Sequence, residues 1–164
     1  MTDVTIRRAG PEDRATIRAF MDALQEHERS IDPSKLGAED ATPPYMAEVE
    51  EAVAKHDGAI FIALLDGRPV GFTACWRDHD SDVTIRAEFR DFGYVSDIYL
   101  APEARGRGIA RRLYQAAEDH CAGLGLKRMR IGAINRNPIA MAAHQRFGFE
   151  PLYTVFDKPI GKGA

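Results

Sequence analysis

The residues whose types and spacing best suit a chemical role form a glycine-rich turn, Arg105-Gly106-Arg107-Gly108-Ile109-Ala110. A β-type run, Tyr94 to Leu100, precedes the turn, and a helical run, Ile109 to Ala122, follows it. Glycines let backbone N–H groups approach an anion without a Cβ in the way. A helix start adds unpaired N–H groups and the positive end of the helix dipole, and the two arginines add charge. The turn therefore predicts a pyrophosphate cradle, with the N–H groups of residues 107–110 facing the anion.

Two familiar phosphate-binding loops do not fit this turn. The dinucleotide fingerprint needs a third glycine, and Arg111 stands at that position. The Walker-type loop needs Gly-Lys-Ser/Thr after its last glycine, and that sequence is absent here. What remains is the pattern Arg-x-x-Gly-x-Ala, formed by Arg105, Gly108 and Ala110.

A second pattern follows a predicted strand at Lys127 to Ile134, and it runs Asn137-Pro-Ile-Ala140-Met-Ala-Ala-His144-Gln-Arg146-Phe-Gly148-Phe149. Together, the two patterns resemble those of the GNAT N-acetyltransferase superfamily. Its signatures are Arg/Gln-x-x-Gly-x-Gly/Ala and, further on, Asn-x-x-Ala-x-x-Leu-Tyr-x-Lys-x-Gly-Phe. The resemblance is firm over residues 94–156 and looser over the first ninety. It implies an enzyme that uses acetyl-CoA as co-substrate, with no metal, and transfers the acetyl group to a primary amine.

The resemblance also implies which residues contact the co-substrate. The turn would hold the pyrophosphate, Asn137 would bond the pantetheine arm, and a backbone N–H of the central strand near Ile98 to Leu100 would hold the oxyanion. From its own sequence context, Asn137 is equally a helix N-cap, because Pro138 follows it. The expected co-substrate contacts are Ile98, Leu100, Arg105, Gly106, Arg107, Gly108, Ile109, Ala110 and Asn137.

The general base is not fixed by the sequence. Several family members carry a carboxylate nine residues before the cradle arginine, and here Ser96 occupies that place. The neighbouring Asp97 lies on the opposite side of an ideal strand, so it is a base only if the strand is bulged or splayed there, and otherwise a structural acid. Glu28, near the end of the first helix, is the second candidate, although such a charged cluster also suits a solvated face. His79, in a turn, ranks third.

The acid that protonates the leaving thiolate is also open. The family's Tyr is replaced by His144. With an ordinary imidazole pKa of about 6.5 and a thiol pKa of about 8.5, a charged His144 can protonate a thiolate, and a neutral one can donate an N–H bond to the sulfur. The alternative is a polar helix residue, with water as the acid. The changes at Ser96 and His144 also support another reading, a CoA-binding regulatory or sensor domain with little turnover.

The length, composition and net charge of the chain exclude several classes of protein. The 164 residues, 45% of them hydrophobic, suit a single domain, 1–164. A net charge of −3 argues against a nucleic-acid partner, and no apolar run approaches the roughly 20 residues of a membrane helix. Two cysteines without metal or redox spacing, and no signal peptide, suggest the cytoplasm. Acids in and after the first helix favour a cationic small-molecule amine as acceptor, and the family resemblance implies a homodimer.

The predicted fold class is α/β, a GNAT-like mixed and mostly antiparallel sheet flanked by helices, in the order β-α-α-β-β-β-α-β-α-β. Ser30 to Pro44 reads as a loop because it holds three prolines and a glycine. Tyr45, just after it, is assigned to the core, with the acceptor site as the alternative. The other predicted elements are strands at 4–8, 59–65 and 69–76, a short strand at 83–89, helices from about 11 to 29 and from 45 to 55, and a last strand after Gly148.

Overall fold

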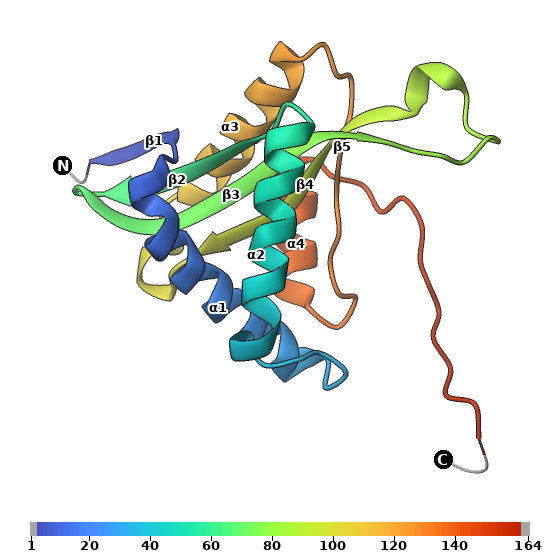
Figure 1. The fold of residues 1–164 in the computed structure, drawn as a ribbon, viewed down its shortest axis with the longest axis horizontal. Coiled ribbons are helices and arrows are strands. Elements are labelled where there is room, and N and C mark those ends of the chain that lie inside the picture. Colours follow the sequence, from blue (N-terminus) through green and yellow to red (C-terminus); the bar gives the residue numbers. More distant parts are fainter. Residues whose placement is uncertain (1–2, 162–164) are drawn as a thin grey trace.

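The computed structural model describes residues 3–161. Five strands form one sheet in the order β1-β2-β3-β4-β5 (Figure 1). Each of the first four runs antiparallel to its neighbours among them, and β5 runs parallel to β4. The strands are β1 (Val4–Arg8), β2 (Ala59–Leu65), β3 (Arg68–His79), β4 (Asp91–Leu100) and β5 (Met129–Ile131). The predicted mixed, mostly antiparallel sheet is therefore confirmed.

Helices cover both faces of the sheet. On one face lie α1 (Arg14–Ile31) and α2 (Ala38–Lys55), and on the other lies α3 (Ile109–Gly123), which links β4 to β5 (Figure 1). The fourth helix, α4 (Pro138–Phe147), follows β5. Gly148, the cap residue that follows α4, has φ of 105°, which confirms the predicted glycine cap.

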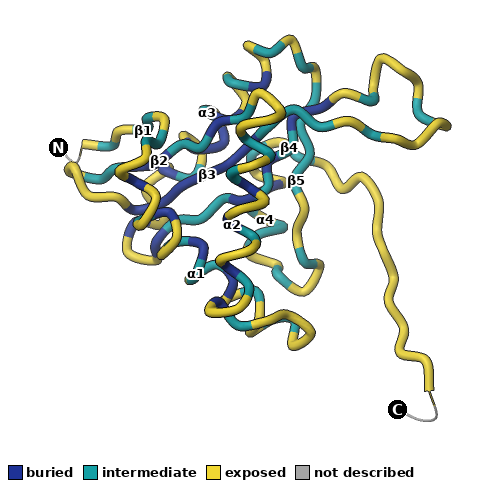
Figure 2. The backbone as a smooth tube through the Cα atoms, in the orientation of Figure 1, coloured by how far each residue is buried: buried dark blue, intermediate teal, exposed yellow. Residues whose placement is uncertain are grey.

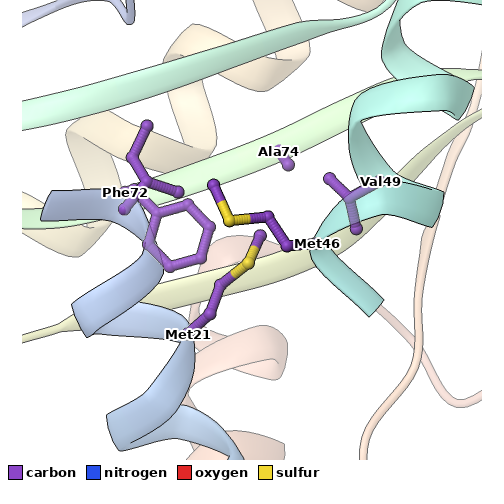
Figure 3. Packing of buried hydrophobic residues seen from close by; sticks show 6 residues of the cluster. Met21, Met46, Val49, Phe72 and Ala74 are labelled. Carbon is purple, nitrogen blue, oxygen red and sulfur yellow. The ribbon is translucent and has the colours of Figure 1, made fainter. Parts of the chain in front are cut away.

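The core on the α1/α2 side is built from long, flexible side chains. Met21 of α1 and Met46 and Val49 of α2 pack on Phe72 and Ala74 of β3 (Figure 3). All five are almost fully buried, and burial follows the sheet through the middle of the molecule (Figure 2). Apolar burial of this kind stabilises by about 25 cal/mol per Å², so this layer holds both helices on the sheet.

The core on the α3 side contains both cysteines. Cys75 of β3 and Cys121 of α3 are buried free thiols that pack with Val95 and Ala117. A Cβ at Gly93 of β4 would lie 2.3 Å from the sulfur of Cys121, so only glycine lets α3 lie this close to β4.

The loop predicted at Ser30 to Pro44 is mostly helical, so that prediction is wrong. Helix α1 continues to Ile31, and α2 begins at Ala38 with Pro43 and Pro44 inside it. Ala38, Thr42, Met46 and Val49 are all buried, at spacings of four, four and three residues. The free energy gained by burying this continuous face outweighs the loss of the two backbone hydrogen bonds that the prolines cannot donate.

The short strand predicted at 83–89 is also wrong. Residues 87–89 form a 3-10 turn, while β3 and β4 extend to His79 and Asp91 as one long hairpin. Asp82 accepts hydrogen bonds from both the backbone N–H and the hydroxyl of Thr84, at 2.8 and 2.7 Å. Such local side-chain bonds compete with a strand ladder and favour a turn.

The last predicted strand has no counterpart among the described residues. From Glu150 to Gly161 the chain has no helix or strand and is exposed. Within residues 3–161, no helix is long and apolar enough to cross a membrane.

Candidate active site

The glycine-rich turn has the backbone geometry of an anion cradle. Gly106 and Gly108 both have φ of 75°, in the left-handed region that favours glycine, and Gly108 caps the start of α3. Within the described chain, the N–H groups of residues 106–111 donate no hydrogen bond to any protein acceptor. The positive end of α3 and these unpaired donors converge on one exposed turn, which fits a bound pyrophosphate.

All four arginines around the turn are exposed, and two of them also donate hydrogen bonds to backbone carbonyls. Arg105 Nε donates to the Leu100 carbonyl at 3.1 Å, which ties the turn to the end of β4. Arg112 Nη1 donates to the Val4 carbonyl at 2.5 Å, so of the Arg111-Arg112 pair it is Arg112 that anchors α3 to β1. Arg107 and Arg111 are exposed. Arg107 lies within the cradle itself, between its two glycines.

Strand β4 parts from β5 just before it reaches the cradle. The parallel pairing covers Gly93 to Val95 and goes no further within the described residues. The Ala101 N–H donates to Val70 of β3 at 2.8 Å, so the alternation of a strand directs the N–H groups of Ile98 and Leu100 away from β3, toward the unpaired side. Two backbone donors therefore face the opening between β4 and β5.

A β-bulge sets the direction of Asp97. Ala74 of β3 pairs with Asp97, whereas its neighbour Cys75 pairs with Val95, so Ser96 is an extra residue in β4. Because of that residue, Asp97 points to the α1/α2 face, while Val95 lies in the α3 core. The condition that the sequence set for Asp97 to act as a base, a bulged strand, is met.

The carboxylate of Asp97 is buried and held by two hydroxyls. Tyr45 of α2 lies 3.1 and 3.0 Å from its two oxygens, and Ser96 Oγ donates to Oδ2 at 2.6 Å. Asp97 is only 4% exposed. Burial raises the pKa of Asp97 to about 6, even though the two hydroxyl bonds act in the opposite direction. The carboxylate is therefore ionised at neutral pH, with an affinity for protons well above that of an ordinary aspartate.

Tyr45 is the partner that sequence reasoning missed. Its assignment to the core is correct in that it packs against the α1/α2 cluster, but its hydroxyl serves Asp97. The two residues lie 52 positions apart in the chain. No local pattern could have paired them, because the contact depends on how α2 packs on β4.

The second base candidate, Glu28, lies on the same side as Asp97. Its carboxylate pairs with Lys35 Nζ at 2.6 Å and is partly exposed. Its negative charge is one of the causes that raise the pKa of Asp97. His79 is elsewhere, paired with Asp91 at 2.7 Å, at the hairpin end of the sheet opposite the cradle.

His144 lies in an aromatic cluster behind the cradle helix. Its Nδ1 is 2.5 Å from the hydroxyl of Tyr114 of α3, and its ring stands at 90° to the ring of Tyr114. Burial lowers the pKa of His144, which favours the neutral imidazole at pH 7. A role as a charged acid is therefore disfavoured, whereas a neutral ring whose Nδ1 accepts from Tyr114 keeps its proton on Nε2.

Asn137 has the capping role that its sequence context predicts. Its Oδ1 accepts a hydrogen bond from the Ala140 N–H at 3.1 Å, at the start of α4. The Nδ2 amide group of Asn137 donates no hydrogen bond to another described residue. Among the described residues, no group of three or more His, Cys, Asp or Glu side chains is arranged to hold a metal ion.

Comparisons with known proteins concern the family and the fold of the chain. The model of the acetyltransferase (GNAT) family matches residues 20–149. An uncharacterized N-acetyltransferase of Bacillus subtilis is 25% identical over 147 residues, 90% of each chain. Aminoglycoside N(6')-acetyltransferase type 1 of Salmonella typhimurium is 28% identical over 111 residues, 68% of this chain and 75% of that protein. A match to an uncharacterized N-acetyltransferase of Methanocaldococcus jannaschii, 28% identical over 62% of this chain, spans only 43% of that longer protein.

Solved structures share the fold along nearly the whole chain. The complex of aminoglycoside N-acetyltransferase AAC(6')-Iy with CoA has a TM-score of 0.72 at 23% identity, covering 98% of this chain and 96% of that one. The same enzyme with a bisubstrate analog, CoA-S-monomethyl-acetylneamine, has a TM-score of 0.71 at 22% identity, covering 97% and 99%. A mutant of BH1408 from Bacillus halodurans reaches 0.83 at 16% identity, covering 95% and 99%. At these identities the likeness concerns the fold.

The cradle geometry predicts that Gly108→Glu abolishes CoA binding while the fold persists. The added carboxylate would occupy the anion position, where the glycine leaves open space. Gly125→Glu is the matched control, because Gly125 also has a positive φ, of 77°, with nothing within 4 Å of its Cβ position. Calorimetric titration with CoA should show no heat of binding for the first variant and wild-type affinity for the second. Unchanged affinity in Gly108→Glu would disprove the cradle.

The buried carboxylate predicts a pH-dependent cost in stability. The pKa of Asp97, about 6 in the folded protein, exceeds the value of about 3.9 expected in the unfolded chain. Between those values the folded state binds more protons, so the contribution of Asp97 to stability falls as pH rises from about 4 to about 6. Asp97→Asn should therefore gain on the wild type over that window, by on the order of 2–3 kcal/mol. Urea denaturation across the range measures this, and a gap that stays constant contradicts it.

Proposed function

This chain belongs to the acetyltransferase (GNAT) family, and we propose that it transfers the acetyl group of acetyl-CoA to a primary amine of a small molecule by direct attack. One observation carries the proposal. The buried carboxylate of Asp97 lies at the start of the opened part of β4, and the cradle of unpaired N–H groups at residues 106–111 follows the end of that strand.

The residues present fit the co-substrate. The turn from Arg105 to Ala110 would hold the pyrophosphate, and Asn137 Nδ2 would contact the pantetheine arm. The N–H groups of Ile98 and Leu100 would lie against the carbonyl oxygen, where charge develops during acyl transfer. Bound acetyl-CoA would supply the acetyl group as an activated thioester.

Asp97 is the residue that we assign to proton removal. An acceptor amine with a pKa of about 10 arrives as an ammonium ion and must lose a proton before it attacks. A carboxylate with a pKa of about 6 is ionised at neutral pH and accepts that proton, directly or through one water, more readily than an ordinary aspartate. Tyr45 and Ser96 hold it in place, and the negative charge of Glu28 favours an approaching cation.

His144 completes the assignment on the leaving-group side. With Tyr114 donating to Nδ1, the Nε2–H of the neutral ring would donate to the sulfur, which stabilises the departing thiolate without a charged imidazole. The proton for the thiol then comes from solvent.

Two observations favour a small-molecule acceptor: the negative charge of the site and the names of related proteins. Glu28 and Asp97 place negative charge on the acceptor side, where a cationic amine would bind. The Salmonella typhimurium relative is named an aminoglycoside acetyltransferase, and AAC(6')-Iy is solved with a bisubstrate analog. Aminoglycosides and other polyamines are therefore the first acceptors to examine.

The proposal predicts thiol release that depends on both substrates. After titration with acetyl-CoA, the protein should release free thiol when a polycationic amine is added, and should release much less with a neutral or acidic amine. Binding of acetyl-CoA without release across the amine panel would favour the alternative, a CoA-binding sensor. Absence of acetyl-CoA binding would refute both functions.

The assignment of the base predicts that Asp97→Asn lowers kcat/KM by about 10²- to 10⁴-fold with little change in CoA affinity. For the wild type, the acidic limb of the kcat/KM profile should follow the Asp97 pKa of about 6. Glu28→Gln is the control, because Glu28 shares the site but would act only through its charge. If Glu28→Gln loses more activity than Asp97→Asn, the two carboxylates have been assigned in the wrong order.

A further inference from the structure

Lys35 places a primary amine beside the carboxylates of the candidate active site. It lies in the short connection between α1 and α2, and its Nζ is 2.6 Å from a carboxylate oxygen of Glu28. Burial is the main cause that raises the pKa of Asp97, and among the smaller causes the negative charge of Glu28 raises it and the positive charge of Lys35 lowers it. Because the influence of a charge falls off with distance, the ammonium group of Lys35 lies near both carboxylates.

The connection that carries Lys35 is held in place on both sides of this residue. Asp32 Oδ1 accepts hydrogen bonds from the backbone N–H and the hydroxyl of Ser34, at 3.0 and 2.7 Å. The Lys35 N–H donates to the Asp32 carbonyl at 3.1 Å. Further on, Glu26 of α1 accepts a hydrogen bond from the Ala38 N–H at 2.7 Å. The backbone of Lys35 therefore has a defined position, from which a flexible four-carbon stem extends.

The same connection lies next to the region expected to contact the pantetheine arm. The pKa of Asp32 is lowered mainly by the two hydrogen bonds just described, and further by the positive charges of Arg136 and Lys35. Arg136 directly precedes Asn137, the residue whose Nδ2 group would contact pantetheine. The connection is therefore close both to the candidate base and to the arm that would carry the reactive thioester at its end.

A second lysine shows what the surroundings of Lys35 add. Lys55, in the last turn of α2, also pairs with a glutamate, Glu51. The side chain of Lys55 is 65% exposed, against 39% for Lys35. A spontaneous reaction with acetyl-CoA in solution would therefore label Lys55 at least as readily as Lys35. A preference for Lys35 would require a thioester bound beside it and a nearby base.

We propose that Lys35 is acetylated by the acetyl-CoA bound to the same chain. The inference rests on the proposed function, because it uses the same thioester and the same base. The ammonium group of Lys35 would leave Glu28 and lose a proton to Asp97, directly or through one water. The neutral amine would then attack the thioester carbonyl, so that a C–N bond forms and the C–S bond breaks. The nitrogen loses its second proton to solvent as the CoA thiolate takes one up, so the products are acetyl-lysine, CoA and one proton.

Tethering replaces the binding step that an external amine needs. An amine held on the same chain acts at an effective concentration on the order of millimolar, whatever the concentration of the protein. Acetylation also removes the ammonium charge that pairs with Glu28. The modified site therefore presents one more unit of negative charge to an external cationic amine.

The test is the mass of the intact chain after incubation with acetyl-CoA alone, followed by peptide mapping of the acetyl group. We expect one acetyl group per chain, located on Lys35, with one equivalent of free thiol released. The rate per chain should not change with protein concentration. Lys35→Arg should remove the label, and the matched variant Lys55→Arg should retain it. Gly108→Glu, which is expected not to bind CoA, should leave Lys35 unmodified.

The remaining outcomes overturn the inference. Equal labelling of Lys55 and Lys35, or a label on Lys35 that persists in Gly108→Glu although CoA no longer binds, would mean a spontaneous reaction in solution. A rate per chain that rises in proportion to protein concentration would mean transfer between chains. If Lys35 stays unmodified while an added amine releases thiol over repeated turnovers, this inference alone fails. If neither reaction occurs, the proposed function fails with it.

Discussion

The single extra residue in β4 organises the candidate active site. With Ser96 inserted, Asp97 faces α1 and α2, while the next residues resume a regular ladder with β3. Without it, the period of two would carry Asp97 into the α3 core beside Val95, where a carboxylate would have neither hydroxyl partner nor access to an amine. The bulge also lies just where β4 parts from β5. One irregularity thus determines both the direction of the acid and the start of the opening that leads to the cradle.

Burying the Asp97 carboxylate lowers the stability of the fold, and the surrounding apolar core has to compensate for that loss. A carboxylate that is almost completely buried opposes folding above its own pKa, and two hydroxyl bonds offset only part of that effect. Its partner Tyr45 packs against the α1/α2 cluster, whose residues Met21, Met46 and Phe72 are apolar and almost fully buried. A buried carboxylate that opposes folding is thus linked through Tyr45 to an apolar layer, as expected where function sets the chemistry and packing supplies the stability.

A structural feature could be predicted from the sequence where the residues that form it are close together in the chain. The cradle was recognisable because two glycines with positive φ and a helix start lie within six residues. The sequence could state the condition under which Asp97 acts, but the bulge that meets it arises from the pairing of two strands. The partners Tyr45 and Tyr114 come from distant helices, so no spacing rule could reveal them. The start of α2 was not predicted because Pro43 and Pro44 indicate a loop when only neighbouring residues are considered. The buried face that keeps this segment helical is set by tertiary packing.

The two cysteines have no part in the proposed chemistry, but their burial determines how the release of CoA can be measured. Cys75 and Cys121 are the only cysteines in the sequence, and both are shut inside the α3 core. A water-soluble thiol reagent therefore meets no protein thiol while the fold is intact, so the colour it develops during turnover belongs to CoA alone. Unfolding would expose two thiols per chain. The reaction of the same reagent with the protein alone, without substrates, therefore distinguishes a variant that is unfolded from one that has lost only its activity.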